Sequence, residues 1–132
     1  MCLTGWLIDR LAALRHGNGA PMARIYGPAD TRDRGGAVAF NLLDPGGRVV
    51  DERAVGQATA AAGISIRTGC FCNPGATEGA FGLTKADWSR ALRASVGLAS
   101  NVDDVERFLA FVELTYRDRV AGTGGLPLRR GC

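Results

Sequence analysis

Apolar residues recur along the chain at two spacings, one typical of helices and the other typical of strands. Helical spacing predicts helices over residues 5–16, from Asp51 up to Gly63, and from Asn101 onward. Thr4, Asp51 and Asn101 are the predicted N-caps, because a short polar side chain can accept hydrogen bonds from the free N–H groups of a first turn. The last helix has the most regular pattern, with apolar residues at i, i+3, i+4 and i+7: Val105, Phe108, Leu109 and Val112.

Shorter β-branched or alternating runs predict four strands, over residues 22–26, 37–42, 64–67 and 92–96. The second run has a period of two, because Val38, Phe40 and Leu42 alternate with small or polar residues. The predicted order is helix, strand, strand, helix, strand, long loop, strand, helix. This order favours an α+β fold, in which helices cover a small, mainly antiparallel sheet.

The chain has 132 residues, which is enough for one domain with its own core. We assign residues 1–120 to that domain and predict a disordered tail over residues 121–132. Residues 68–89 form a connection longer than most loops, and such connections are often functional. No apolar run approaches the ~20 residues that span a bilayer. The first residues do not resemble a signal peptide, so we expect a cytoplasmic protein.

The distribution of charge does not favour a nucleic-acid interface. The chain has 16 basic and 13 acidic residues, for a net charge of +3, and every basic residue except Lys85 is an arginine. Acidic residues are interspersed among them, and no basic run is longer than two residues. The charges therefore do not form the concentrated patch that tracks phosphates.

The four cysteines lie at positions 2, 70, 72 and 132. They do not have the spaced pairs of a disulfide framework. A Cys-x-Cys pair with one distant histidine, His16, is also a poor match for a zinc site, so we expect no metal. We interpret His16 as a last-turn residue of the first helix, suited to the partial negative charge there, rather than as a catalytic base.

One stretch combines a cation with two thiols. Residues 64–67 read as a strand, a glycine- and proline-containing loop follows, and Arg67 lies at the junction. Cys70 and Cys72 come within the next five residues. A nearby cation favours the thiolate, which is the nucleophilic form of cysteine. Cys72 is therefore a candidate nucleophile, and the alternative is an inert loop cysteine.

A second arginine, Arg93, has a related position. If residues 64–67 and 92–96 bury their apolar side chains against the same core, Arg67 and Arg93 emerge together on the opposite face. Two guanidinium groups on one face suit a carboxylate, which they can hold with paired hydrogen bonds. The alternative is a pair of solvated surface arginines.

Four segments carry a family resemblance: residues 25–28 (IYGP), 34–41 (RGGAVAFN), 67–76 (RTGCFCNPGA) and 93–97 (RASVG). With them the chain resembles, over residues 4–116, the C-terminal small domain of class V aminotransferase-fold enzymes that use pyridoxal phosphate. These enzymes include cysteine desulfurases and the desulfurase-like domain of molybdenum cofactor sulfurases. The third segment is the most specific, and its form is most similar to that of the cofactor sulfurases.

The resemblance implies roles for single residues. Arg67, Gly69 and Cys72 match the Arg-x-Gly-x-x-Cys motif that carries the desulfurase nucleophile. Cys72 would then become a persulfide as alanine is released, with Arg67 beside the reacting group. Arg93 matches the arginine that holds the substrate carboxylate. Cys70 falls at a variable position of the motif and is interpreted as a bystander or a resolving thiol.

The chain departs from the family in one respect. Family members bind pyridoxal phosphate through a Schiff-base lysine, next to a histidine, on a large upstream domain. The single lysine here, Lys85, follows the cysteine motif. The resemblance therefore implies pyridoxal phosphate in a parent enzyme, a missing cofactor-binding domain or a sulfur-acceptor protein as the partner, and no desulfuration by this chain alone.

Three functions stay open at this point. The chain can be the C-terminal domain of a cysteine-desulfurase-like enzyme, supplying the persulfide-forming Cys72 and the two arginines. It can instead be a stand-alone carrier that accepts sulfur on Cys72 from another protein. The third possibility is the small domain of a lyase or isomerase that uses pyridoxal phosphate, in which Cys72 is incidental.

Overall fold

The structure is a computed structural model that describes residues 2–28, 30–32, 35–68, 91–97 and 100–122. Most of the predicted long connection lies outside these residues, and so do Cys70, Cys72 and Lys85. The predicted tail lies outside them from residue 123 onward.

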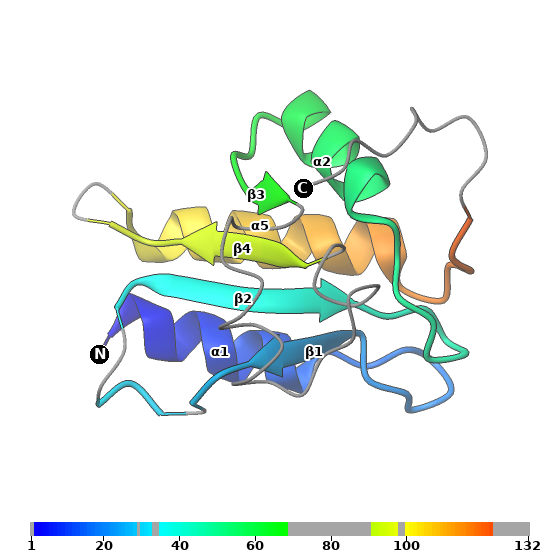
Figure 1. Ribbon diagram of the computed structural model, residues 1–132, viewed down its shortest axis with the longest axis horizontal. Coiled ribbons are helices and arrows are strands. Elements are labelled where there is room, and N and C mark those ends of the chain that lie inside the picture. The colour runs from blue at the N-terminus through cyan, green and yellow to red at the C-terminus, as the bar shows by residue number, and fades with distance from the viewer. Residues whose placement is uncertain (1, 29, 33–34, 69–90, 98–99, 123–132) are drawn as a thin grey trace, which may run out of the picture.

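The described part of the chain is an α+β domain, as the pattern predicts (Figure 1). Its helices are α1 (Leu3–Ala13), α2 (Glu52–Ala61) and α5 (Val102–Tyr116). Its strands are β1 (Ala23–Tyr26), β2 (Ala37–Leu42), β3 (Arg67–Thr68) and β4 (Leu92–Ser95). The strands form one sheet in the order β1-β2-β4-β3, and every pair of neighbours is antiparallel.

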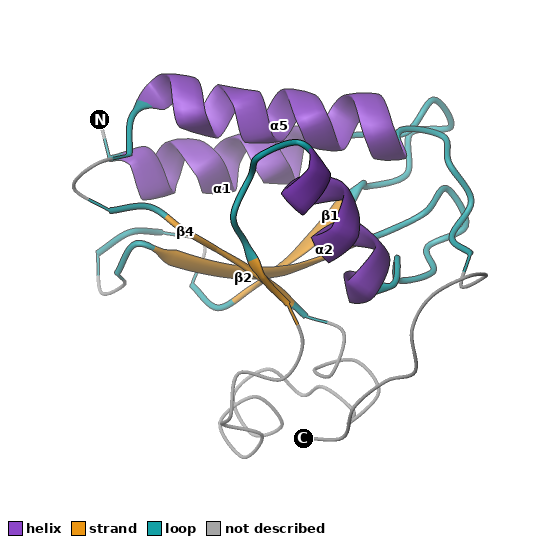
Figure 2. Ribbon diagram, turned by 90° about the horizontal axis from the view of Figure 1, so that it is seen from above, coloured by secondary structure: helices purple, strands orange, loops and turns teal. Residues whose placement is uncertain are grey.

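Helices α1 and α5 lie side by side on one face of the sheet, and α2 lies past the β3 edge (Figures 1 and 2). The core fills the space between the two helices and the sheet. Phe40 of β2 meets Phe108 of α5 edge to face, with ring centroids 6.0 Å apart. Val38, Leu42 and Leu92 are also completely or almost completely buried. Burying side chains of this size contributes about 1.5–3 kcal/mol each, so this layer supplies most of the driving force for folding.

Two of the three predicted N-caps are confirmed. Asn101 and Asp104 form a reciprocal capping box at the start of α5, in which each side chain accepts a hydrogen bond of 3.0 Å from the other residue's backbone N–H. Asp51 caps α2 by accepting a hydrogen bond from the backbone N–H of Arg53 at 2.9 Å. In both caps the two hydrogen-bonded residues lie two or three positions apart in the chain, so the sequence alone can predict these caps.

The predicted limits of α1 are wrong at both ends. Cys2 is its N-cap residue, and Thr4 is buried within the first turn. The helix ends at Ala13, three residues before His16. The chain then folds back on itself, because Arg15 and Pro21 form an isolated antiparallel bridge. That pairing takes His16 out of the helix.

The predicted strand over residues 64–67 is also shorter in the structure, where β3 is Arg67–Thr68. The backbone N–H of Ile64 donates to the carbonyl oxygen of Thr59 at 2.8 Å, and Gly63 has a φ of 71°. Ile64 therefore belongs to the turn that ends α2. Pairing with β4 begins three residues later, at Arg67. Glycine suits this turn because a side chain disfavours positive φ.

Candidate functional site

One row of residues crosses the sheet with one member from each strand. Tyr26 pairs with Ala39, Ala39 with Arg93, and Arg93 with Arg67. Directly paired residues point to the same face of a sheet, and neighbours along a strand point to opposite faces. Since Phe40 faces α5, this row lies on the face away from α1 and α5. We call this side of the sheet the arginine face.

The structure places Arg67 and Arg93 together, as the alternation predicts. Directly opposed residues of an antiparallel pair have Cβ atoms about 4.5–5.5 Å apart. Arg67 is exposed, and Arg93 is half-buried. Two guanidinium groups at this spacing can hold one carboxylate with several charge-assisted hydrogen bonds. Carboxylate binding itself remains a prediction.

A polar pair lies on the same face, across β1 and β2. Asn41 is completely buried, and its side-chain Nδ2 donates to the hydroxyl of Tyr26 at 2.7 Å. Asn41 pairs in register with the exposed Arg24, so a third arginine belongs to this face. The sequence pattern indicated no separate role for Asn41. The available signal was that it is the one polar residue in the run from Ala37 to Leu42.

Cys72, the predicted nucleophile, lies outside the described residues, and so does Cys70. The described thiol is that of Cys2, which is exposed at the start of α1. The nearby backbone N–H groups of Gly5 and Thr4 in the first turn of α1 lower the pKa of the Cys2 thiol. Cys2 is therefore an accessible surface thiol that any experiment on Cys72 has to remove.

His16 has a structural role instead of the predicted place in the last turn of α1. Its side chain has no exposed surface. Nδ1 accepts a hydrogen bond from the backbone N–H of Asp118 at 2.9 Å, and Nε2 lies 2.8 Å from the carbonyl oxygen of Leu43. In a neutral ring Nε2 is then the donor to Leu43. The imidazole joins the chain after α1, the residue after β2 and the end of α5.

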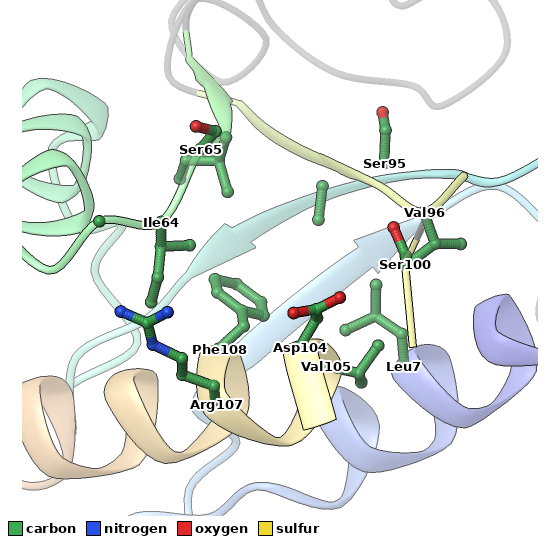
Figure 3. A pocket seen from close by; sticks show the side chains of 13 residues that line it. Leu7, Ile64, Ser65, Ser95, Val96, Ser100, Asp104, Val105, Arg107 and Phe108 are labelled. Atoms are coloured by element: carbon green, nitrogen blue, oxygen red, sulfur yellow. The ribbon is translucent and has the colours of Figure 1, made fainter. Parts of the chain in front are cut away.

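A cavity with a volume of about 220 Å³ lies on the helix side of the sheet. Figure 3 shows it between the segment before β3, the end of β4 and the first turns of α5, with Phe108 and Leu7 beneath. Its charged side chains are already engaged. Arg107 donates to the carbonyl oxygen of Ala62 at 2.7 Å, and Asp104 belongs to the capping box. This cavity is lined by the residues that precede the short β3 and lies on the opposite side of the sheet from the arginine face.

Among the described residues, no cluster of three histidine, cysteine or acidic side chains could hold a metal ion. None of the described helices is both long and apolar enough to cross a membrane.

Comparison with known proteins finds relatives that share one name. The chain is 35% identical over 139 residues to a molybdenum cofactor sulfurase of Aspergillus terreus, across 86% of this chain and 17% of that protein. It is 31% identical over 150 residues to the molybdenum cofactor sulfurase of Bos taurus, across 96% of this chain and 17% of the relative. The match to the Solanum lycopersicum protein is 32% over 135 residues, across 86% of this chain and 16% of that protein. The chain thus spans about one sixth of these relatives.

Among solved structures, the chain is similar to the cystine C–S lyase C-DES, solved in complex with its reaction product cysteine persulfide. The TM-score is 0.53 at 17% sequence identity, across 88% of this chain and 23% of the lyase chain. At this identity the likeness concerns the fold. No protein-family model matches the chain.

Proposed function

Because this chain belongs to the class V aminotransferase-fold family as a cysteine-desulfurase-like domain, we propose that it is the C-terminal domain of a sulfur-transferring enzyme that uses pyridoxal phosphate. In this proposal Cys72 accepts sulfur from L-cysteine, while Arg93 and Arg67 hold the carboxylate of that substrate. The observation that carries the proposal is the register of β3 against β4, which pairs Arg67 directly with Arg93. Cys72 follows the end of β3 by four residues, a reach of at most about 14 Å.

The proposed chemistry is a transfer of sulfur to a thiolate. The Cys72 thiolate attacks the sulfur of the substrate cysteine, and a new S–S bond forms as the substrate C–S bond breaks. The electron pair of that bond passes to the substrate carbon, which takes up a proton. The products are a persulfide on Cys72 and alanine. The nearby guanidinium groups favour the thiolate before attack, since a positive neighbour lowers the pKa of a thiol.

Pyridoxal phosphate would supply the electron sink for C–S cleavage, and the described residues do not form a site for it. The cofactor is held through a lysine. None of the described residues is a lysine, because the single lysine of the sequence is Lys85. The arginine face suits a carboxylate instead. We therefore assign the cofactor to a part of the parent enzyme outside this chain.

The proposed partners follow from this division of roles. One is a cofactor-binding large domain, which would meet the arginine face. The other is a sulfur-acceptor protein or cofactor precursor that takes the sulfur from Cys72. We propose that both are met in the cytoplasm.

The decisive experiment combines this chain with the cofactor-binding large domain of a related desulfurase. The mixture receives L-cysteine, alanine release is measured, and intact-protein mass spectrometry detects one added sulfur atom. The chain carries Cys2→Ser throughout, because the exposed Cys2 thiol would otherwise compete. Cys72→Ser is the test variant, and Cys70→Ser is the matched control two residues away.

We expect sulfur on Cys72 together with alanine, loss of both in Cys72→Ser, and little change in Cys70→Ser. Continued alanine release by Cys72→Ser would contradict the proposal and favour a lyase in which this cysteine is incidental. Sulfur that reaches Cys72 only from a complete, separate desulfurase would favour a carrier instead.

A further inference from the structure

We propose that residues 64–66 form a strap that closes onto the free edge of β4, and that an anion bound by Arg67 and Arg93 favours this closure. In the structure these residues precede the two-residue β3 and are not paired with β4. The closure itself is independent of the proposed function, whereas the role of the anion rests on it. The inference adds a conformational control to the carboxylate site.

The first observation is an unpaired stretch of sheet edge. The backbone N–H of Val96 donates to the carbonyl oxygen of Gly36 at 2.8 Å, so the backbone groups of Val96 point toward β2. Successive residues of a strand direct these groups to opposite sides. The N–H and C=O of Ser95 therefore point to the β3 side, where neither group has a hydrogen-bond partner among the described residues. The edge of β4 is thus open where β3 stops.

The second observation is the register of the β3–β4 pair, in which Arg67 lies opposite Arg93. Continuing the same ladder by two residues places Ser65 opposite Ser95. Antiparallel residues two positions apart repeat the same hydrogen-bond pattern, so these two serines can exchange a pair of backbone hydrogen bonds. The open edge therefore has a partner of the correct register within the same chain.

The third observation is an apolar fit on the helix side. In the continued ladder Ile66 comes opposite Ala94, a member of the core, and Ile64 comes opposite Val96. Both isoleucines are half-buried and line the cavity of about 220 Å³, and Ile64 and Val96 lie on opposite sides of it in Figure 3. Closure would bring the isoleucines over Phe108 and fill this space. Burial of their apolar surface favours the closed strap.

The strap is short and is held at both ends. At one end the N–H of Ile64 donates to the carbonyl oxygen of Thr59 at 2.8 Å, and at the other end Arg67 is paired with β4. In the continued ladder the N–H of Ile64 points away from β4, so its hydrogen bond can persist on closure. The backbone between these two points is two residues long, so closure costs little conformational entropy.

The charge at the neighbouring position of the ladder opposes closure. Arg67 and Arg93 are directly opposed, and like charges in such positions weaken the pairing of two strands. An anion held by both guanidinium groups offsets this repulsion and strengthens the pairing that the strap continues. Coupling between two equilibria is reciprocal, so closure of the strap should tighten anion binding by the same factor.

The first test traps the closed strap with an engineered disulfide. The 132-residue chain carries serine at its four native cysteine positions, together with Ile64→Cys and Val96→Cys, which become directly opposed on closure. The pair Ile64→Cys and Ala94→Cys, displaced by two residues, is the matched control. In a glutathione redox buffer we expect the 64–96 disulfide to form at least about fivefold faster, because directly opposed Cβ atoms come closest to the disulfide distance.

The coupling to the anion predicts two further results. Acetate, compared with chloride at the same ionic strength, should speed formation of the 64–96 disulfide by about two- to fivefold, the range expected for one cross-strand charge pair. Arg67→Gln should speed it to a similar extent without acetate and should remove the effect of acetate. Arg24→Gln is the control and should do neither, because Arg24 lies opposite Asn41 rather than opposite an arginine.

Amide hydrogen exchange tests the same closure in the unsubstituted chain. The N–H of Ser95 is without a partner in the open state, so we expect it to exchange at least about twofold more slowly in acetate than in chloride. The N–H of Val96 is the internal control, since its hydrogen bond to Gly36 is present in both states. Chemical shifts of amides on the arginine face report separately whether acetate binds.

Equal disulfide rates for the two cysteine pairs would overturn the closure. Bound acetate that changes neither the disulfide rate nor the exchange of Ser95 would overturn the control by the anion and leave the proposed carboxylate site intact. Absence of acetate binding, with the effect of Arg67→Gln on the disulfide rate preserved, would mean the reverse. The carboxylate site would then have failed, and the strap would stand.

Discussion

Arg67 and Arg93 face each other directly across the β3–β4 pair, so two positive charges occupy one position of the ladder. Like charges in directly opposed positions destabilise a sheet. A sequence under selection for stability alone would avoid this pairing. An anion bound by both guanidinium groups would offset this repulsion.

Arg67→Gln should therefore make the chain slightly more stable. We expect the free energy of unfolding in urea to rise by a few tenths of a kcal/mol at low salt, and the gain to shrink in 1 M salt, where charges are screened. Arg24→Gln is the matched control, since Arg24 lies on the same face but pairs with Asn41 rather than with an arginine. An equal gain in the free energy of unfolding in both variants would mean that the lower net charge causes the effect. Removal of the direct Arg67–Arg93 pairing would then not be the cause.

Asp44 anchors the turn after β2 to the end of the described chain. Its buried carboxylate accepts hydrogen bonds from the backbone N–H groups of Gly46, Arg48 and Ala121, at 2.9, 2.8 and 3.1 Å, and from Nε of Arg48 at 3.0 Å. Burial by itself raises the pKa of Asp44. The hydrogen bonds from Arg48 and Ala121 and the Arg48 charge outweigh burial and hold the pKa below its usual value.

The sign of the pH dependence follows from this lowered pKa. The carboxylate stabilises the folded chain at any pH above its unfolded pKa of about 4, and this contribution is lost as the pH falls through the folded pKa. Asp44→Asn should lower the free energy of unfolding by about 2 kcal/mol at pH 7. The difference in free energy of unfolding between the unsubstituted chain and Asp44→Asn should become smaller below about pH 4. Asp30→Asn, at an exposed carboxylate, is the control and should have little effect.

Gly36 lies against β4 with no room for a side chain. A Cβ atom at this position would overlap the carbonyl oxygen of Val96. The backbone N–H of Val96 also donates to the Gly36 carbonyl oxygen at 2.8 Å. Gly36→Ala should lower the free energy of unfolding by about 1–3 kcal/mol, because β2 and β4 must separate. The neighbouring Gly35 has nothing within 4 Å of a built Cβ, so Gly35→Ala should change stability by less than about 0.5 kcal/mol. Similar losses in both variants would contradict the close approach.

His16→Ala should be among the more harmful substitutions outside the apolar core. The substitution removes the imidazole that hydrogen-bonds to the Leu43 carbonyl and the Asp118 N–H, and it opens a cavity. We therefore expect the free energy of unfolding in urea to fall by about 2–4 kcal/mol. Arg15→Ala, at the exposed neighbour, should cost far less. A small loss of unfolding free energy in His16→Ala would mean that water replaces the imidazole in both hydrogen bonds.

Much of this fold and part of the candidate site could be predicted from the sequence. The caps at Asp51 and Asn101 were predictable, because a cap and its partner lie within three residues of each other. The period of two in β2 and β4 predicted that Arg93 points away from the core. The shared face of Arg67 and Arg93 followed once both strands were assumed to cover one core.

Tertiary structure decided what depends on contacts between distant residues. The place of His16 depends on Leu43 and Asp118, which are 27 and 102 positions away. The direct pairing of Arg67 with Arg93 depends on a register that joins segments 26 residues apart. The hydrogen bond from Asn41 to Tyr26 required β1 and β2 to pair. Local spacing determines which face a residue takes, whereas only the packed chain determines which partner it meets there.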